Sequence, residues 1–293
     1  MKSIICYTEL DKYIMNIKEE NIKIFRDTLK QIANDDQLQE FVKHSKTHQN
    51  FYSARMEFDM KPEDYPSYFG KADIVVTKNG SFNAARQYSQ SKVAVLNFAS
   101  ATNPGGGVDK GSNAQEECLC RCSTLYECLN TDWAKEHFYE PHRRSGTPLH
   151  NDDIIFTPGV VIIKSDSYTG LYQRAYVDVI TCAAPNLRET PANAYNHENG
   201  EGVKVSDEEL YEIHKKRADK ILNCALYHGD DTVILGAFGC GAFKNPPEVV
   251  AKAYKDIITE KYLYKFKHIE FAVYCGRDDT NYKVFSRILG DLK

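Results

Sequence analysis

The pattern of apolar positions divides the chain into a helical first part and a second part in which short strands alternate with helices. Residues 9–34 are strongly charged but carry apolar side chains at helical spacing, which predicts one or two amphipathic helices. Residues 36–69 are polar and aromatic without a clear period. We therefore expect a mainly helical N-terminal extension over residues 1–70 and a second, α/β unit over residues 71–293.

Beyond residue 70, short runs of β-branched and apolar residues indicate strands that are buried in a sheet. The expected strands are residues 73–77, 93–98, 176–182, 232–235 and 268–275, with two more in 151–163 that break at 157–159. The expected helices are residues 81–90, 112–128, 206–227, 246–260 and 280–289. Because the strands alternate with helices, we expect an α/β fold with a largely parallel or mixed sheet.

Composition and charge narrow the class of protein. The chain has 293 residues, of which 42% are hydrophobic and 27% charged, and its net charge is −4. A protein that binds nucleic acid in general would carry a basic patch, and the sequence of this chain does not indicate one. The apolar run at the start is too short for a signal peptide, and no run has the length of a membrane span. With nine cysteines, an odd number, the simplest expectation is reduced thiols in a cytoplasmic protein.

The first motif that indicates chemistry is a glycine-rich loop after the strand at 93–98. Gly105, Gly106 and Gly107 are followed, after seven residues, by Gln115, Glu116 and Glu117. Glycines allow a backbone to approach a bulky anionic or sugar ligand closely. Carboxylates beside a bound sugar are the groups that break glycosidic bonds. The structural alternative is a flexible loop before a helix whose acidic first turn only favours the helix dipole.

A second glycine-rich loop carries Gly236, Gly239 and Gly241 and joins a buried strand to a helix. In this arrangement phosphate groups bind to free N–H groups at the helix N-terminus. The spacing matches neither a dinucleotide-binding fingerprint nor a P-loop. The structural alternative is a tight strand-to-helix connection without a ligand. Because ligands bind outside the carboxyl ends of strands in open α/β sheets, the two loops together would form one site.

Cysteines could also indicate a metal site or a nucleophile. Cys118, Cys120 and Cys122 do not lie on one helix face, and no Cys/His pair follows at zinc-site spacing. We therefore expect them to pack in a helix. Cys240 lies in the second glycine loop, but no histidine lies near it in sequence to activate it.

Two arginines form a further candidate contact for phosphate. Arg143 and Arg144 are expected in a polar loop with His142 and His150. Exposed arginine is the ordinary case, so we favour a solvated surface pair over a ligand contact.

These motifs together resemble a known family. The segments NFASATNPGGGVDKGSNAQEECLCR, VDVITCAAPN and LGAFGCGAFKNPPEVVAKAY are similar to the microbial-type poly(ADP-ribose) glycohydrolases of the macrodomain superfamily. The GGG–x7–QEE spacing falls inside the signature of that family. The resemblance runs from about residue 70 to 290, and it is weaker over residues 1–70.

The resemblance implies a fold and an activity. The fold would be a macrodomain, in which a mixed six- or seven-stranded sheet lies between helices with an ADP-ribose cleft at one edge. The activity would be hydrolysis of the ribose–ribose O-glycosidic bond in poly(ADP-ribose), which releases ADP-ribose. No metal or cofactor is expected, because the neighbouring diphosphate can stabilise the cationic transition state.

The resemblance also implies roles for individual residues. Glu117 would be the catalytic acid/base, Glu116 would hydrogen-bond the ribose hydroxyls, and Gln115 would support the loop. The residues implied in ADP-ribose binding are Asn103, Gly105, Gly106, Gly107, Val108, Gly239, Cys240, Gly241, Ala242, Phe243 and Tyr274. Among them Phe243 would pack on the distal ribose, and Tyr274 would lie near the adenine.

The implied partners are ADP-ribose and poly(ADP-ribose) on modified proteins, with ADP-ribosylated nucleic acid as a further candidate. We expect no membrane partner and a monomer. Three alternatives stay open. They are a hydrolase acting on mono-ADP-ribosylated protein or nucleic acid, a non-catalytic ADP-ribose-binding macrodomain, and a nucleotide-binding protein with both loops around phosphates. The intact QEE triplet speaks against pure binding. Substrate choice is expected to depend on the loops 130–153 and 185–204.

Overall fold

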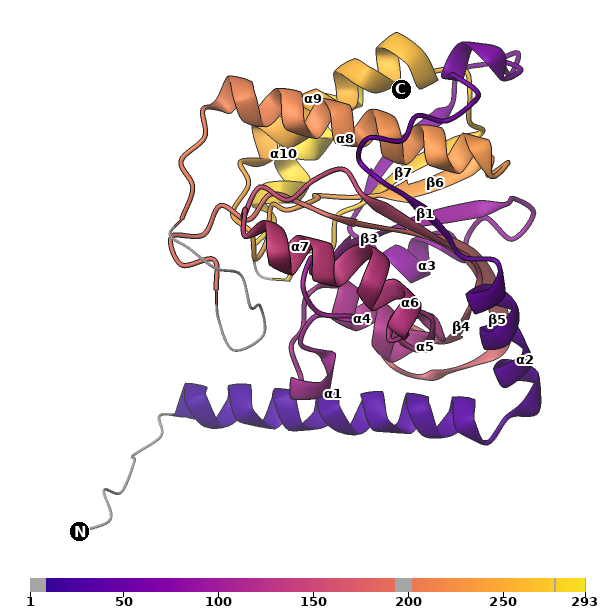
Figure 1. Cartoon of the computed structure of the whole chain (residues 1–293), viewed down its shortest axis with the longest axis vertical. Coiled ribbons are helices and arrows are strands. Elements are labelled where there is room, and N and C mark those ends of the chain that lie inside the picture. Colours follow the sequence, from indigo (N-terminus) through magenta and orange to yellow (C-terminus); the bar gives the residue numbers. More distant parts are fainter. Residues whose placement is uncertain (1–8, 193–201, 277, 293) are drawn as a thin grey trace.

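The centre of the molecule is a single seven-stranded sheet (Figure 1). The computed structural model describes residues 9–192, 202–276 and 278–292. The strands are β1 (Asn50–Tyr52), β2 (Asp73–Thr77), β3 (Val93–Ala99), β4 (Ile154–Lys164), β5 (Gly170–Ala183), β6 (Thr232–Leu235) and β7 (His268–Ala272). Their order in the sheet is β1-β4-β5-β3-β6-β7-β2. The expected α/β class with a mixed sheet is confirmed.

The direction of the strands decides where their loops meet. β5, β3, β6, β7 and β2 pair in parallel, and among the described strands only β4 runs in the opposite direction, antiparallel to β1 and β5. The carboxyl ends of the five parallel strands therefore lie along one edge of the sheet, which is where ligands bind in open α/β folds.

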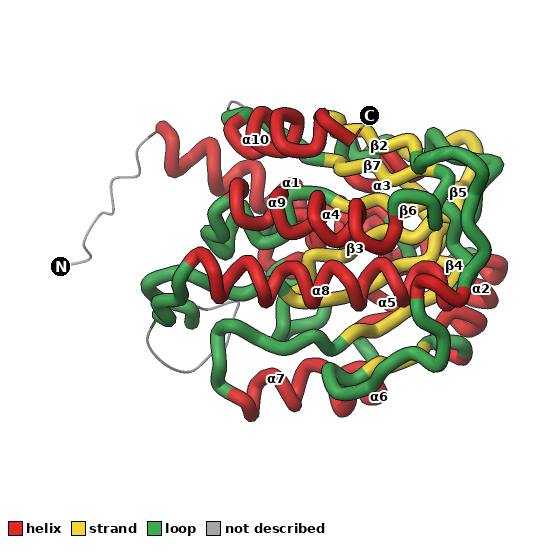
Figure 2. The backbone as a smooth tube through the Cα atoms, turned by 90° about the horizontal axis from the view of Figure 1, so that it is seen from above, coloured by secondary structure: helices red, strands yellow, loops and turns green. Residues whose placement is uncertain are grey.

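Helices cover both faces of the sheet. The helices are α1 (Glu9–Ala33), α2 (Asp36–Thr47), α3 (Ser81–Ala85), α4 (Gln115–Cys122), α5 (Leu125–Leu129), α6 (Asp132–Ala134), α7 (Glu140–Ser145), α8 (Asp207–Tyr227), α9 (Pro247–Ile257) and α10 (Thr280–Leu289). Figure 2 shows α8, α9 and α10 side by side over one face. On the other face lie α3, α4 and α5, and α1 lies outside them (Figure 1). None of the described helices is both long and apolar enough to cross a membrane.

The two faces have separate cores, because successive strand residues point to opposite sides. On β3, Ala94 and Leu96 pack with the buried residues of α8, α9 and α10. Val93 and Val95 pack instead with buried residues of α3, α4 and α5, among them Phe82. β3 is buried on both sides, as the sequence of a central parallel strand predicts.

The structure corrects the expected break in the strand at 151–163. β4 is one strand of eleven residues, and Pro158 and Gly159 lie within it. The pairing with β5 shifts register between Thr157 and Val160, so the proline and glycine form a bulge. Proline is tolerated at a bulge, because no ladder hydrogen bond is lost there.

The helix expected at 112–128 is also corrected. It consists of α4 and α5, which are separated at Ser123 and Thr124. Ser123 is extended and forms a β-bridge with Ile162 of β4. The helix expected at 81–90 ends already at Ala85. Tertiary contact with the sheet thus overrides the local preference for a continuous helix.

The N-terminal segment is helical, but it also contributes to the sheet. β1 pairs with β4 through the register Asn50↔Phe156, Phe51↔Ile155 and Tyr52↔Ile154. The boundary proposed at residue 70 stays a prediction.

Candidate active site

The two glycine-rich loops lie side by side at the carboxyl edge of the sheet. They follow β3 and β6, which pair in parallel through the register Val93↔Thr232 to Val95↔Ile234. The ring of Phe98, near the end of β3, lies 5.4 Å from the ring of Phe238 in the second loop. The loop that follows β5 is a third neighbour, because β5 pairs with β3 as far as Ala99↔Ala183. The sequence prediction that both glycine loops share one edge is consistent with this arrangement.

The first glycine loop has a backbone conformation that residues with a side chain rarely adopt. Gly105 and Gly106 have φ values of 68° and 58°, in the left-handed region that favours glycine. The N–H of Gly106 donates to the carbonyl oxygen of Asn103 at 3.0 Å. A Cβ on Gly106 would lie 2.5 Å from Oε1 of Glu117. Gly106 therefore allows the loop backbone to lie directly against the glutamate carboxylates.

Glu117 is fixed by two backbone donors. Its Oε1 accepts from the N–H of Gly107 at 2.9 Å, and its Oε2 accepts from the N–H of Ala114 at 3.1 Å. The residue is 7% exposed. The first hydrogen bond joins α4 to the glycine loop, and the second closes the first turn of α4. The carboxylate therefore has one defined position beside the loop.

Glu116 lies deeper than Glu117, with 2% of its surface exposed. Its Oε2 accepts from the N–H of Ser100 at 2.7 Å, and its Oε1 accepts from Nδ2 of Asn97 at 3.3 Å. Burial raises the pKa of Glu116 well above its ordinary value, and the charge of Glu117 raises it further. Glu116 therefore retains a proton more readily than an isolated glutamate does.

The side chain of Gln115 pairs with the backbone of β3 just beyond the point where the pairing of β3 with β6 ends. Its Oε1 accepts from the N–H of Phe98 at 2.9 Å, and its Nε2 donates to the carbonyl oxygen of Leu96 at 2.8 Å. The amide also donates to Oγ of Ser81 at 3.0 Å. A side-chain amide thus makes the hydrogen bonds that a neighbouring strand would make. This fixes the start of α4 relative to the sheet.

The second glycine loop is held by Asn245, which is 2% exposed. Its Nδ2 donates to the carbonyl oxygens of Pro185 at 2.7 Å and of Gly239 at 3.0 Å. Gly239 has a φ of 78°, and a Cβ there would lie 2.7 Å from Nδ2 of Asn245. Oδ1 of Asn245 lies 2.8 Å from Nε2 of the buried His214 on α8. One amide thereby connects the loops after β5 and β6 to a helix.

Phe243 lies between these two loops. Its carbonyl oxygen accepts from the N–H of Leu187 at 2.9 Å, and the guanidinium of Arg188 lies 5.6 Å from its ring centre. The ring of His150 lies 6.0 Å away. Gly241 and Ala242, just before Phe243, are exposed.

Cys240 is not suited to be a nucleophile in this setting. Burial raises the pKa of its thiol, so the reactive thiolate is disfavoured. Its Sγ lies 3.8 Å from the carbonyl oxygen of Phe238.

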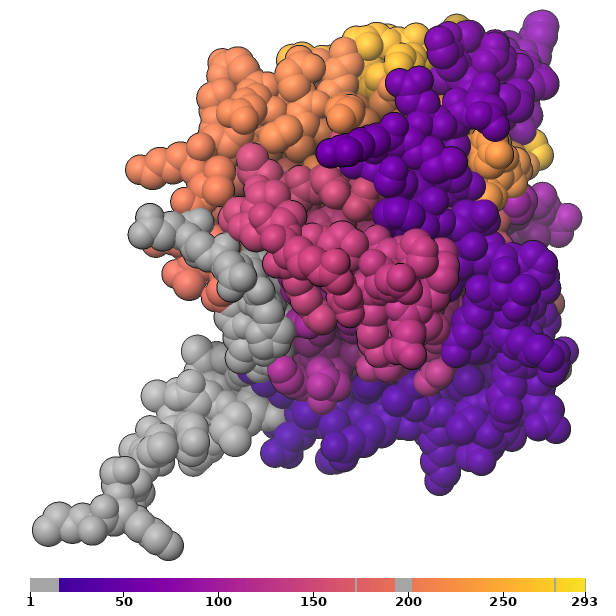
Figure 3. Space-filling view, in the orientation of Figure 1, coloured from indigo at the N-terminus to yellow at the C-terminus, as the bar shows by residue number. Residues whose placement is uncertain are grey.

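The structure corrects the expected loop around Arg143 and Arg144. Both lie on α7, which continues from α6 through a π-helical segment, Lys135–Tyr139. Arg144 is exposed and pairs with Glu140 at 2.8 Å. Arg143 is half-buried, and its Nη2 donates to Oδ1 of Asn103 at 3.2 Å. Figure 3 shows the surface of α6 and α7 in pink, between the indigo N-terminal residues and the orange α8.

Two of the expected binding residues differ in exposure. Val108 is buried at the end of the glycine loop, where its N–H donates to the carbonyl oxygen of Gly105 at 3.1 Å. Tyr274 follows β7 and is 75% exposed. β7 is parallel to β6, so Tyr274 follows a strand of the same edge. The part of the expected 185–204 loop that spans residues 193–201 lies outside the described residues.

The sequence did not predict the buried polar residues that hydrogen-bond to the site. They are Asn97, which contacts Glu116, and Asn245 with His214, which hold the second loop. Asn97 could have been noticed as the one amide inside the apolar run at 93–98. Asn245 precedes two prolines, but nothing in the sequence pairs it with a histidine about thirty positions earlier.

The three cysteines expected to pack in a helix, Cys118, Cys120 and Cys122, all lie on α4. Cys120 and Cys122 are buried, and Cys118 is half-buried. Among the described residues, no group of three or more His, Cys, Asp or Glu side chains is arranged to hold a metal ion.

Comparison with known proteins identifies the family. A family model described as the catalytic domain of microbial-type PARG matches residues 20–165. A solved poly(ADP-ribose) glycohydrolase from Thermomonospora curvata, bound to the inhibitor ADP-HPD, is 29% identical. It matches with a TM-score of 0.77 over 92% of this chain and 99% of that chain.

A second solved enzyme is also similar. The poly(ADP-ribose) glycohydrolase from Deinococcus radiodurans, in complex with ADP-ribose, is 29% identical, with a TM-score of 0.71 over 86% of this chain and 97% of that chain. No curated protein matches the sequence significantly. The shared fold, the matched catalytic-domain model and the GGG–QEE geometry agree. This chain belongs to the microbial-type poly(ADP-ribose) glycohydrolases.

Proposed function

We propose that this protein hydrolyses the ribose–ribose O-glycosidic bonds of poly(ADP-ribose) and releases ADP-ribose. The observation that carries the proposal is the position of Glu117. Two backbone N–H groups hold its carboxylate against a triple-glycine loop, at the sheet edge where α/β folds bind ligands. The two solved enzymes that the chain resembles are named poly(ADP-ribose) glycohydrolases, which supports the same activity here.

In the proposed mechanism Glu117 acts first as an acid and then as a base. It protonates the 2′ oxygen of the departing unit while the distal ribose develops oxocarbenium character. The carboxylate then accepts a proton from the water that attacks this ribose. Burial and the charge of Glu117 raise the pKa of the neighbouring Glu116, which favours a proton on Glu116.

The binding residues are assigned by their place along the sheet edge. Gly105, Gly106 and Gly107 would contact the distal ribose and the diphosphate, together with Asn103 and Val108. The second loop would bind the diphosphate through the backbone of residues 239–242. We further propose that Phe243 packs on the ribose and that the exposed Tyr274 stacks on the adenine.

We infer further properties from the composition and the fold. The eight cysteines among the described residues are free, which supports a reducing compartment such as the cytoplasm. The proposed substrates are poly(ADP-ribose) chains on modified proteins, with ADP-ribosylated nucleic acid as a further candidate, and the proposed state is a monomer. The assignment of residues 71–293 to the macrodomain superfamily stays part of the proposal.

The central test is the Glu117→Gln variant. Turnover of poly(ADP-ribose) should fall at least about 100-fold, which is the effect of removing a general acid/base, while ADP-ribose still binds. Release of free ADP-ribose and calorimetric binding measure the two effects. Glu136→Gln, which changes an exposed glutamate on the π-helical segment before α7, is the control and should retain full turnover. Normal turnover by Glu117→Gln would refute the assignment.

The substrate is tested with three materials in parallel. The full chain is incubated with poly(ADP-ribose), with mono-ADP-ribosylated protein and with ADP-ribosylated DNA, and free ADP-ribose is measured. We expect release from poly(ADP-ribose). Release only from one of the other two materials, or binding without release, would show that the proposed activity is wrong.

A further inference from the structure

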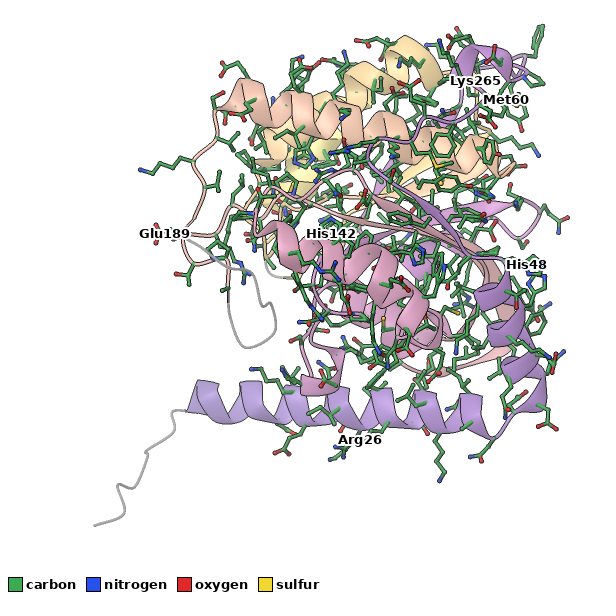
Figure 4. The ribbon with its side chains drawn as sticks, in the orientation of Figure 1. Arg26, His48, Met60, His142, Glu189 and Lys265 are labelled. Carbon is green, nitrogen blue, oxygen red and sulfur yellow. The ribbon has the colours of Figure 1, made fainter. Side chains whose placement is uncertain are left out.

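Two adjacent arginines on α7 have different environments. Arg144 is exposed and makes an ordinary i,i+4 ion pair with Glu140. Arg143 is half-buried and turns to the glycine loop. Figure 4 labels His142, the residue before it, on the helix that lies in front of the sheet. The two arginines are therefore a natural pair for comparison.

Arg143 is connected to the turn that shapes the first glycine loop. Its Nη2 donates to Oδ1 of Asn103 at 3.2 Å. The carbonyl oxygen of Asn103 accepts from the N–H of Gly106, the glycine that lies against the glutamate carboxylates. A residue forty positions away in sequence thus contacts Asn103, whose carbonyl oxygen is hydrogen-bonded to the glycine loop.

The charge of Arg143 has no counter-ion within the described part of the chain. No carboxylate there lies within ion-pair distance of its guanidinium. Its buried Nε makes no hydrogen bond to any described residue. A half-buried cation without a counter-ion costs free energy, and an anion that binds beside it reduces that cost.

The same charge acts close to the paired glutamates. Burial raises the pKa of Tyr139, one helical turn before Arg143, and the charge of Glu116 raises it further. The charge of Arg143 lowers the pKa of the same side chain. Glu116 and Arg143 are thus both near Tyr139. Arg143, through Asn103, and Glu117, through the N–H of Gly107, therefore both contact the segment that forms the glycine loop.

We propose that Arg143 is a substrate-binding residue, whose guanidinium holds Asn103 and supplies the counter-charge for a diphosphate of the bound ADP-ribose unit. The planar guanidinium can donate hydrogen bonds to an amide oxygen and to a phosphate at the same time, which a lysine ammonium does less well. This inference rests on the proposed function, since it names a further residue for the same ligand.

The experiment measures ADP-ribose affinity of the full chain by calorimetry for the wild type and three variants. Arg143→Gln should weaken binding about 10-fold or more, because a charge-assisted hydrogen bond is lost. Arg143→Lys should lose less affinity but not recover the wild-type value. Arg144→Gln, the matched control, should bind within about twofold of the wild type, as exposed pairs contribute little.

Two further readouts separate binding from mere support of the fold. With poly(ADP-ribose), Arg143→Gln should raise KM more than it lowers kcat. Its ADP-ribose affinity should also depend less on salt than that of the wild type, because one charge has been removed. In a double-mutant cycle with Asn103→Ala, the two losses should not add, since the residues are in contact.

The outcomes distinguish this inference from the proposed function. If the wild type binds ADP-ribose and Arg143→Gln binds it equally, with unchanged salt dependence, only the role of Arg143 is overturned. If the wild type binds no ADP-ribose, the proposed function is wrong and this inference falls with it. If Arg143→Gln does not fold, Arg143→Lys decides, because wild-type affinity in that variant overturns the need for a guanidinium.

Discussion

At the scale of the residue, Gly106 determines how closely the loop and the glutamates approach each other. Its φ of 58° disfavours any side chain, and a Cβ would lie 2.5 Å from a Glu117 oxygen. We expect Gly106→Ala to displace the Glu117 carboxylate and to lower turnover by an order of magnitude or more, since misplaced catalytic groups are inefficient. ADP-ribose release measures this effect.

Gly146 offers a matched control for the backbone strain. It has a φ of 63°, and a Cβ there would meet nothing within 4 Å. Gly146→Ala and Gly106→Ala should each lose about 1–2 kcal/mol of stability in denaturant unfolding from the left-handed backbone. Only Gly106→Ala should lose turnover. Equal turnover in the two variants would contradict the proposed contact between loop and carboxylate.

At the scale of the element, α8 and the second glycine loop are joined through a buried histidine. His214 is fully buried, and burial lowers its pKa from 6.5 to about 4. Its neutral form is therefore favoured in the folded protein. The corresponding stability, about 3 kcal/mol, is complete above pH 6.5 and is lost as the pH falls to about 4.

We expect His214→Gln to reduce this loss of stability on acidification. A glutamine amide can still donate to Oδ1 of Asn245, but it does not titrate. Denaturant unfolding at several pH values between 4 and 7 measures the difference. His44→Gln, at an exposed position of α2, is the control and should keep the wild-type pH dependence. Equal pH dependence in wild type and His214→Gln would show that His214 does not carry the effect.

The elements also show how far sequence reasoning reached. It predicted β2, β3, β6 and α8 because buried parallel strands and a capped amphipathic helix have strong local patterns. It placed the QEE triplet at a helix start for the same reason. It missed the separation of α4 from α5, because the bridge between Ser123 and Ile162 depends on a distant strand. The helical setting of Arg143 was missed too, because a π-helical segment has no clear period.

The supports of the site were not predictable in the same way. Gln115 was expected to support the loop, but its pairing with Leu96 and Phe98 depends on where β3 and β6 diverge. The hydrogen bond between Asn245 and His214 joins two elements that are distant in sequence. Such contacts belong to the folded sheet edge and leave no local pattern in the chain.

At the scale of the whole molecule, α1 lies across the far end of the glycine loop (Figure 1). Nδ2 of Asn21, which is 4% exposed, donates to the carbonyl oxygen of Gly111 at 3.1 Å. A Cβ on Gly111 would lie 2.3 Å from the carbonyl oxygen of Lys18, so the loop and α1 are in backbone contact. The ring of Phe25 lies 4.8 Å from Tyr126, which packs against Gly105. The N-terminal helix therefore supports the loop that faces the glutamates.

This arrangement predicts that a change in α1 alters catalysis without touching the substrate. Asn21→Ala leaves the Gly111 carbonyl without its buried donor, so stability should fall by about 1–3 kcal/mol. Turnover should fall as well, at a temperature where the variant is fully folded, because the loop loses a fixed end. Asn16→Ala, at an exposed position of the same helix, should change neither. If Asn21→Ala loses stability but retains full turnover, α1 stabilises the fold without positioning the site.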